Sequence, residues 1–154
     1  MRKAVLCGLV LVASLFGGGS SALASDASIR AVVIAQAQRQ AGEDARFQKA
    51  VRKLSTKAQK RKAKAAAGRQ SASVKLWRDA LAVETAETEP IAAAQKKMLD
   101  ALDLYRKGLR RLTQGLNMAL NNGGNSGVSK AKRALKNMRT ASKRVGQAAE
   151  VIVG

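Results

Sequence analysis

Histidine is absent from the 154 residues, so no step in this chain can depend on an imidazole, and a Ser-His-Asp triad is excluded. There is one cysteine, Cys7, and aromatic residues make up only 3% of the sequence. So few rings disfavour recognition of single-stranded nucleic acid by base stacking. Acidic residues are also scarce, with 10 Asp+Glu against 29 Lys+Arg and a formal net charge of +19. This excess predicts an attraction to anionic partners.

Residues 1–24 have the pattern of a secretory signal peptide. Arg2 and Lys3 precede an apolar run of 13 residues, 4–16, which is the length of a signal-peptide hydrophobic region. Ala22 and Ala24 are the small residues before the expected cleavage, which we predict after Ala24. The alternative is an uncleaved anchor, because residues 4–25 are uncharged and could just cross a bilayer core of about 30 Å. We expect an exported protein of the periplasm, the cell envelope or the extracellular medium.

Cleavage would leave residues 25–154 as a single basic helical-bundle domain. This part has 27 basic and 10 acidic residues, a formal net charge of +17, and no cysteine. A chain of this size can bury enough apolar surface for one core. The domain is therefore expected to be stabilised by packing, without a disulfide bond.

The composition and the spacing of apolar residues predict helices throughout this domain. Interruptions at 68–71 and 121–127 divide it into three helices, 28–67, 71–121 and 127–153. Spacings of three and four residues, typical of a coiled-coil or bundle seam, recur in all three. In the first helix this seam comprises Phe47, Val51, Leu54, Ala58, Arg61 and Ala65, and in the last Val128, Lys132, Leu135, Met138, Ser142, Val145, Ala149 and Ile152. The middle seam comprises Val74, Trp77, Leu81, Glu84, Thr88, Ile91, Gln95, Met98, Leu102, Tyr105, Leu109, Leu112, Leu116 and Ala119.

Pro90 leaves two architectures open. Proline removes a backbone donor and disfavours helical geometry in the residue before it, so Thr88-Glu89-Pro90 could begin a new helix. The seam nevertheless keeps its phase across the proline, which favours a kinked but continuous helix. The predicted fold is all-α: an antiparallel bundle of three long helices, or four if the chain breaks at Pro90, with coiled-coil-like seams.

Folding about the two interruptions predicts specific neighbours. A turn at Arg69 places Arg61 opposite Trp77, as a cation–π contact, and a turn at Gly124 places Leu109 opposite Met138.

Three glycines fall within the expected helices, namely Gly108, Gly115 and Gly146. Each indicates either close helix approach or a tolerated substitution.

Charge is arranged in bands along the chain. Residues 45–78 hold 12 bases and no acid, residues 79–103 hold six acids and two bases, and residues 104–149 hold 11 bases and no acid. The first interruption would let Glu84 and Glu87 face Lys53, Lys57 or Lys60, leaving most of the positive charge unmatched. The alternative is a solvated basic face without a dedicated ligand.

The candidate polyanion-binding residues are basic positions on the outer faces of the expected helices. They are Lys53, Lys57, Lys60, Lys64, Arg110, Arg111, Lys132, Arg133, Lys136, Arg139, Lys143 and Arg144. Binding of a polyanion would relieve their mutual repulsion and release counterions.

No motif indicates catalysis, a cofactor, a metal or a small-molecule substrate. The carboxylates between Asp79 and Asp103 lack a glycine-bearing calcium loop and are interpreted as solvated or ion-paired side chains. No phosphate-binding or dinucleotide-binding glycine motif occurs. The sequence therefore predicts a non-enzymatic protein that binds anionic envelope polymers, lipid head groups or extracellular nucleic acid. The alternative is a structural or chaperone-like bundle that acts through a protein partner or self-association.

Overall fold

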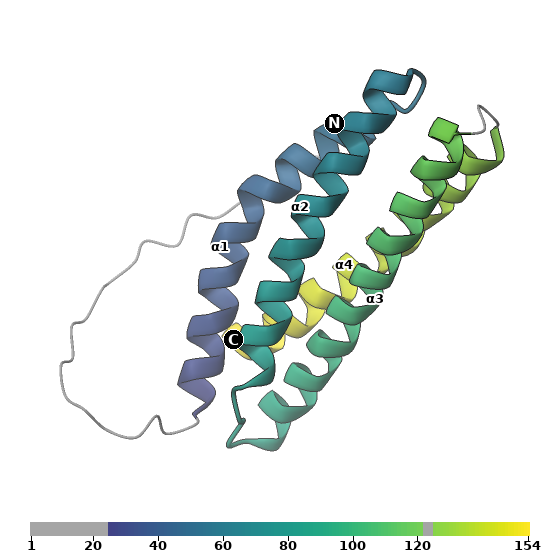
Figure 1. Cartoon of the computed structure of the whole chain (residues 1–154). Helices are drawn as coiled ribbons and strands as arrows, with labels where there is room; N and C mark the ends of the chain where they lie inside the picture. Colours follow the sequence, from purple (N-terminus) through teal and green to yellow (C-terminus); the bar gives the residue numbers. More distant parts are fainter. Residues whose placement is uncertain (1–24, 122–124) are drawn as a thin grey trace, which may run out of the picture.

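Four helices form an all-α bundle in the computed structural model, which describes residues 25–121 and 125–154 (Figure 1). They are α1 (Asp26–Val51), α2 (Lys57–Ala82), α3 (Glu89–Asn121) and α4 (Asn125–Val153). The predicted signal peptide, residues 1–24, lies outside the described residues. Among the helices described, none is long and apolar enough to cross a membrane.

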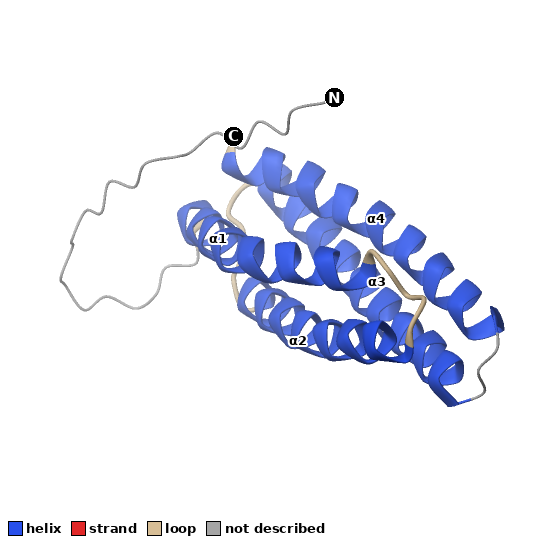
Figure 2. Ribbon diagram, turned by 90° about the horizontal axis from the view of Figure 1, so that it is seen from above, coloured by secondary structure: helices blue, strands red, loops and turns tan. Residues whose placement is uncertain are grey.

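The helices pack around a common core, each antiparallel to its neighbours in the order α1, α2, α3, α4 (Figure 2). The α3–α4 pair is the most extensive contact, and the α1–α4 pair is the least extensive of the main ones. Arg30 Nε of α1 donates a hydrogen bond of 2.9 Å to the Ile152 carbonyl near the end of α4.

The first chain reversal lies at residues 52–56, so the predicted helix 28–67 is wrong. Thr56 and Gln59 form a capping box: Gln59 N donates to Thr56 Oγ1 at 3.2 Å, and Thr56 N donates to Gln59 Oε1 at 3.1 Å. This arrangement satisfies two backbone donors at the start of α2. Leu54, 8% exposed, anchors the connection in the core. These interactions stop α1 and restart the chain as α2.

The predicted turn at 68–71 is the interior of α2, and Gly68 is exposed there with no unusual backbone conformation. The buried face continues through it, because Gln70 lies on the same face as Val74 and Trp77. Gly68 is therefore a tolerated helical glycine, which costs about 1 kcal/mol relative to alanine. Arg61 and Trp77 belong to one helix, about 24 Å apart along its axis, so the predicted cation–π pair is wrong.

The second reversal confirms the four-helix alternative. Residues 83–88 connect α2 to α3, and Pro90 lies in the first turn of α3, where its missing N–H would have no intrahelical partner anyway. Asp26 of α1 holds this connection, accepting hydrogen bonds from Glu87 N at 2.9 Å and Thr88 Oγ1 at 2.6 Å. The Thr88 hydroxyl lowers the pKa of the Asp26 carboxyl.

The predicted seams are correct in α3 and partly wrong elsewhere. Every α3 position named for the middle seam is buried, but Glu84 and Thr88 of that seam lie in the α2–α3 connection and are not buried. In α2, Ala58, Arg61 and Ala65 are exposed, and Ala63, Ala66 and Ala67 face the core instead. In α4, Lys132 and Ser142 are exposed. The buried α4 residues are Gly127, Ala131, Ala134, Met138, Ala141, Val145, Ala148 and Ile152. Small alanines define these faces as much as the larger apolar residues do.

Glycines bring α3 and α4 into close contact. A Cβ added to Gly115 would lie 2.7 Å from the Ala131 nitrogen and 2.9 Å from the Gly127 oxygen. A Cβ on Gly108 would collide with the Met138 side chain, which places the predicted Leu109–Met138 neighbourhood within one residue of the actual register. Gly146, in contrast, has nothing within 4 Å of such a Cβ. Close approach therefore explains Gly108 and Gly115, and tolerance explains Gly146.

We expect Gly115→Ala and Gly146→Ala to change stability in opposite directions. At Gly115 the methyl group meets the α4 backbone, so separation of the helices should destabilise the fold by about 1–3 kcal/mol despite the better helix propensity. At Gly146 the added methyl meets open space and should stabilise the protein by up to about 1 kcal/mol. Urea unfolding monitored by circular dichroism measures both. Equal stabilisation by the two variants would contradict the close contact.

Candidate anion-binding surface

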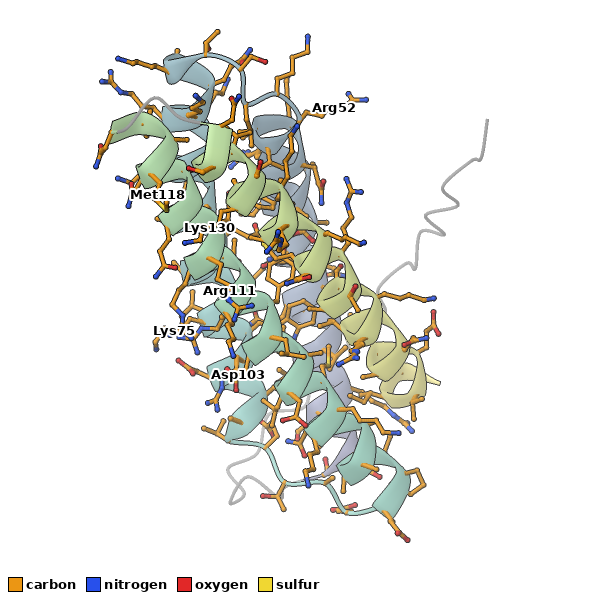
Figure 3. The ribbon with its side chains drawn as sticks, turned by 90° about the vertical axis from the view of Figure 1, so that its right-hand side faces the viewer. Arg52, Lys75, Asp103, Arg111, Met118 and Lys130 are labelled. Atoms are coloured by element: carbon orange, nitrogen blue, oxygen red, sulfur yellow. The ribbon has the colours of Figure 1, made fainter. Side chains whose placement is uncertain are left out.

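The twelve predicted residues are distributed over three helices and one connection. Lys53 lies between α1 and α2; Lys57, Lys60 and Lys64 lie on α2; Arg110 and Arg111 lie on α3; and Lys132, Arg133, Lys136, Arg139, Lys143 and Arg144 lie on α4. All are exposed except Lys60, which is half-buried. In Figure 3 basic side chains point outward from the ribbon, Arg111 from α3 among them.

None of the twelve belongs to an ion pair in the described part of the chain. The cations that do are Arg46, Arg69, Lys75, Arg78 and Arg106. Their acidic partners are Glu43, Asp79 and Asp103, on α1, α2 and α3. The hydrogen bond from Lys75 lowers the pKa of Asp79. Ion pairing therefore uses few of the basic residues and, among those described, none from α4.

The expected pairing of Glu84 and Glu87 with Lys53, Lys57 or Lys60 is wrong. Both acids lie in the α2–α3 connection, whereas these lysines lie at the other end of α2. Glu84 accepts a hydrogen bond from Ser28 Oγ of α1 instead. The misplaced first turn caused this error, because it reversed the chain in the middle of what is one helix.

The α4 cations lie in two adjacent rows outside its buried face. Spacings of four, three and four residues align Lys132, Lys136, Arg139 and Lys143, which we call the α1-side stripe because Arg139 lines a pocket with Phe47 of α1. The same spacing aligns Arg133, Asn137, Thr140 and Arg144, which we call the α3-side stripe because its last three residues line a hollow with α3. The structure thus divides the predicted α4 residues between these two rows.

Two hollows bring cations of different helices together. The α3–α4 hollow, of about 230 Å³, is lined by Lys107, Arg111 and Arg144 together with the polar side chains of Asn137 and Thr140.

The α2–α3 hollow, of about 450 Å³, contains Lys57, Arg61 and Lys64 beside Leu120 and Asn121 at the end of α3. Either hollow presents several cations to one anionic group, and guanidinium groups bind carboxylates and phosphates through paired hydrogen bonds.

Lys107, Asn137 and Thr140 are the residues of the α3–α4 hollow that the prediction omitted. Their contribution depends on the α3–α4 register, in which Gly108 packs against Met138. Folding the sequence about Gly124 nearly gives this register. The sequence feature that could have identified this hollow is the pair of polar residues, Asn137 and Thr140, between the cations of α4.

A polar cluster occupies the core level where α1, α2 and α3 meet. Asp44 accepts hydrogen bonds from Gln70 and Gln40, and Gln70 Nε2 lies 3.4 Å from the Tyr105 hydroxyl. Ser73 Oγ donates to Gln40 Oε1 at 2.5 Å. These residues adjoin a pocket of about 310 Å³ on the α1–α4 side, which Asp44 and Tyr105 line. Two of the three buried glutamines, Gln40 and Gln70, thus belong to a cluster that adjoins the α1–α4 side of the bundle.

Burial raises the pKa values of Asp44 and Tyr105, the two titratable groups of this cluster. Desolvation raises the pKa of the Asp44 carboxyl above its ordinary value, and the hydrogen bonds from Gln70 and Gln40 offset only part of that effect. Burial, together with the nearby Asp44 charge, raises the pKa of Tyr105 to about 12. Gln70 Oε1 and Trp77 Nε1 have no hydrogen-bond partner among the described residues.

Comparison with family models, curated proteins and solved structures finds no match for this chain.

We expect Asp44→Asn to stabilise the protein at pH 7. Because the folded-state pKa of Asp44 is raised, ionisation of this carboxyl makes folding less favourable as the pH rises through the raised pKa. An amide keeps an acceptor for Gln70 and Gln40 but carries no charge. The gain over the parent should shrink as the pH falls through the raised pKa of Asp44 and nearly vanish below 3.8, the ordinary value for aspartate.

Urea unfolding between pH 3 and pH 7 measures this difference. Asp100→Asn is the control, because that carboxyl is exposed and makes no ion pair with the described residues. A variant of Asp44 that loses more stability at pH 7 than at pH 3 would exclude the proposed effect of burial.

Proposed function

We propose that this protein is exported, has no catalytic activity and binds an anionic polymer of the cell envelope by electrostatics. The observation that carries the proposal is the imbalance of charge: residues 25–154 hold 27 basic residues against 10 acidic ones. Ion pairs among the described residues engage only five of those cations. The remaining cations are attracted to any surface or chain of negative charge, including lipid head groups and nucleic acid.

The distribution of the cations favours a long, flexible polymer. The α1-side stripe, the α3–α4 hollow and the α2–α3 hollow lie on different sides of the bundle. A chain of phosphates or carboxylates can contact more than one of these regions at once. Phe47, Trp77 and Tyr105 are all buried, so no aromatic ring among the described residues of the bundle is available for base stacking. This argues against dedicated recognition of single-stranded nucleic acid.

A structural or chaperone-like role through a protein partner is the second candidate. Leu76 and Val83 are 66% and 79% exposed, more than apolar side chains in a packed core. A partner could cover them by helix packing. Single apolar residues on a surface are common, however, and these two do not form a patch by themselves. The charge imbalance therefore supports polyanion binding more strongly.

We expect the protein to be retained on heparin with a steep salt dependence. Replacing the α1-side stripe by glutamines, as Lys132→Gln/Lys136→Gln/Arg139→Gln/Lys143→Gln, should lower the salt concentration of elution. The slope of log affinity against log salt should become shallower by up to about 0.9 per lost contact. Salt-gradient chromatography and titrations at several salt concentrations measure these changes.

The matched control removes four ion-paired cations, as Arg46→Gln/Arg69→Gln/Lys75→Gln/Arg106→Gln. It lowers the net charge equally and should weaken retention less, because these groups already have carboxylate partners. Elution of the parent protein at or below physiological salt would refute polyanion binding.

We also expect the exported protein to begin at Ser25. Signal peptidase should cleave after Ala24, leaving Ser25 as the residue whose side chain accepts from Ser28 N at the start of α1. N-terminal sequencing and the intact mass of the product in the envelope or medium measure this. A product that keeps residues 1–24 and remains in the cytosol would contradict export.

A further inference from the structure

The outer face of the α3–α4 pair carries an apolar trough beside the cationic hollow. The trough has a volume of about 660 Å³ and is lined by Ala93, Ala94 and Ala101 of α3 and Ala148 of α4. Leu104 and Val151, 45% and 54% exposed, extend its apolar surface. Ala94, Ala101 and Ala148 are almost fully buried and form the floor of the trough, whereas the exposed apolar surface along it comes from Pro90, Ala93, Leu104 and Val151.

The trough and the α3–α4 hollow are continuous. Leu104 and Arg144 line both of them. Beyond these two residues the surface changes from alanine to Lys107 and Arg111, with Asn137 and Thr140 opposite on α4. The furrow, as we call the trough and hollow together, therefore has apolar residues interspersed with Lys97, Asp100 and Gln147 in the trough and gathers three cations at the end formed by the hollow.

We infer that the furrow binds an anionic amphiphile, a single alkyl chain with a phosphate or carboxylate head. The chain would lie along the trough, and the head would contact Lys107, Arg111 and Arg144. This inference rests on the proposed function and names a ligand class for one part of the cationic surface. Charge complementarity favours this orientation: the hollow holds three cations and no carboxylate, whereas in the trough Lys97 is accompanied by the carboxylate Asp100.

The dimensions and composition of the furrow fit an alkyl chain better than a partner helix. Pro90 and Leu104 bound the trough on α3, about 21 Å apart along the helix axis. Its volume falls within the range of pockets that bind small ligands. A docked helix requires successive apolar pockets for its anchors, but Lys97, Asp100 and Gln147 interrupt these walls with polar groups.

Dodecyl phosphate is the probe that tests this inference, used below its micelle concentration and followed by calorimetry on the purified full-length protein. Inorganic phosphate supplies the head alone, and dodecyl maltoside supplies the same chain with a neutral head. We expect dodecyl phosphate to bind at least about tenfold more tightly than either, since each comparison removes one of the two contacts. Equal binding of inorganic phosphate or of dodecyl maltoside would overturn the inference.

Variants separate the furrow from the rest of the basic surface. Arg111→Gln/Arg144→Gln should weaken dodecyl phosphate binding about tenfold, through lost charge-assisted hydrogen bonds. Arg110→Gln/Arg133→Gln removes the same charge from the same two helices outside the furrow, and should change this binding less than about twofold. Equal weakening by the two pairs would overturn the assignment of the head.

Ala93→Gln/Leu104→Gln tests the trough, because it places polar groups there without changing the net charge. It should weaken dodecyl phosphate binding about tenfold while leaving the salt concentration of elution from heparin unchanged. Circular dichroism checks that each variant remains folded. Sedimentation showing a dimer that this variant abolishes would instead assign the trough to self-association and overturn the inference.

The two proposals fail in different ways. Retention on heparin without binding of dodecyl phosphate would refute the furrow and leave polyanion binding intact. Loss of heparin retention in the parent protein would refute polyanion binding, whatever the amphiphile does.

Discussion

Close packing of α3 against α4 is the contact on which the rest of the bundle depends. Gly115 and Gly127 allow the two backbones to approach, and Ala119 and Ala131 complete the contact with small side chains. This interface must offset a strong repulsion, because α4 carries seven basic residues and one acid, and α3 carries six bases and three acids. Apolar contact acts over the few ångströms between packed atoms, whereas the repulsion extends over a Debye length of about 10 Å at moderate salt. If the helices could no longer approach closely at these glycines, the apolar attraction between α3 and α4 would weaken, but the repulsion between their basic residues would not.

The other interfaces are stabilised differently. Ion pairs join α1 to α2 through Arg69 and Glu43, and α2 to α3 through Arg78 and Asp103. No ion pair in the described structure involves α4. The α1–α4 side combines the weakest packing of the four neighbouring pairs with a partly buried carboxylate, Asp44. Because α4 takes part in none of these ion pairs, it is held almost entirely by apolar contact. Its basic side chains remain available to an external anion.

The sequence predicts this architecture where local chemistry and apolar spacing are decisive, and fails where burial overrides a local signal. The α3 seam and the helical start at Pro90 follow from apolar spacing and proline chemistry, and both agree with the structure. Gly68 is a helix breaker in isolation, but burial of Gln70 and Trp77 holds α2 together through it. The actual break depends on the Thr56–Gln59 capping box, a pattern easily overlooked within an otherwise helical segment. The exposure of the candidate cations was predictable from their charge. Their division between two rows on α4 was not, because the predicted seam did not identify the buried residues of this helix correctly.

The proposed anion binding would be coupled to folding through the same basic residues. The bundle holds the cations of α3 and α4 at short separations, whereas an unfolded chain could spread them apart, so the repulsion is an energetic burden mainly on the folded state. A polyanion that spans Arg111 and Arg144 across the α3–α4 hollow engages cations that only the fold brings together. Such a ligand binds the folded chain more tightly than the unfolded one and stabilises it by mass action. The close spacing of cations that causes repulsion in the free protein would therefore also make a polyanion bind the folded form more tightly than the unfolded chain.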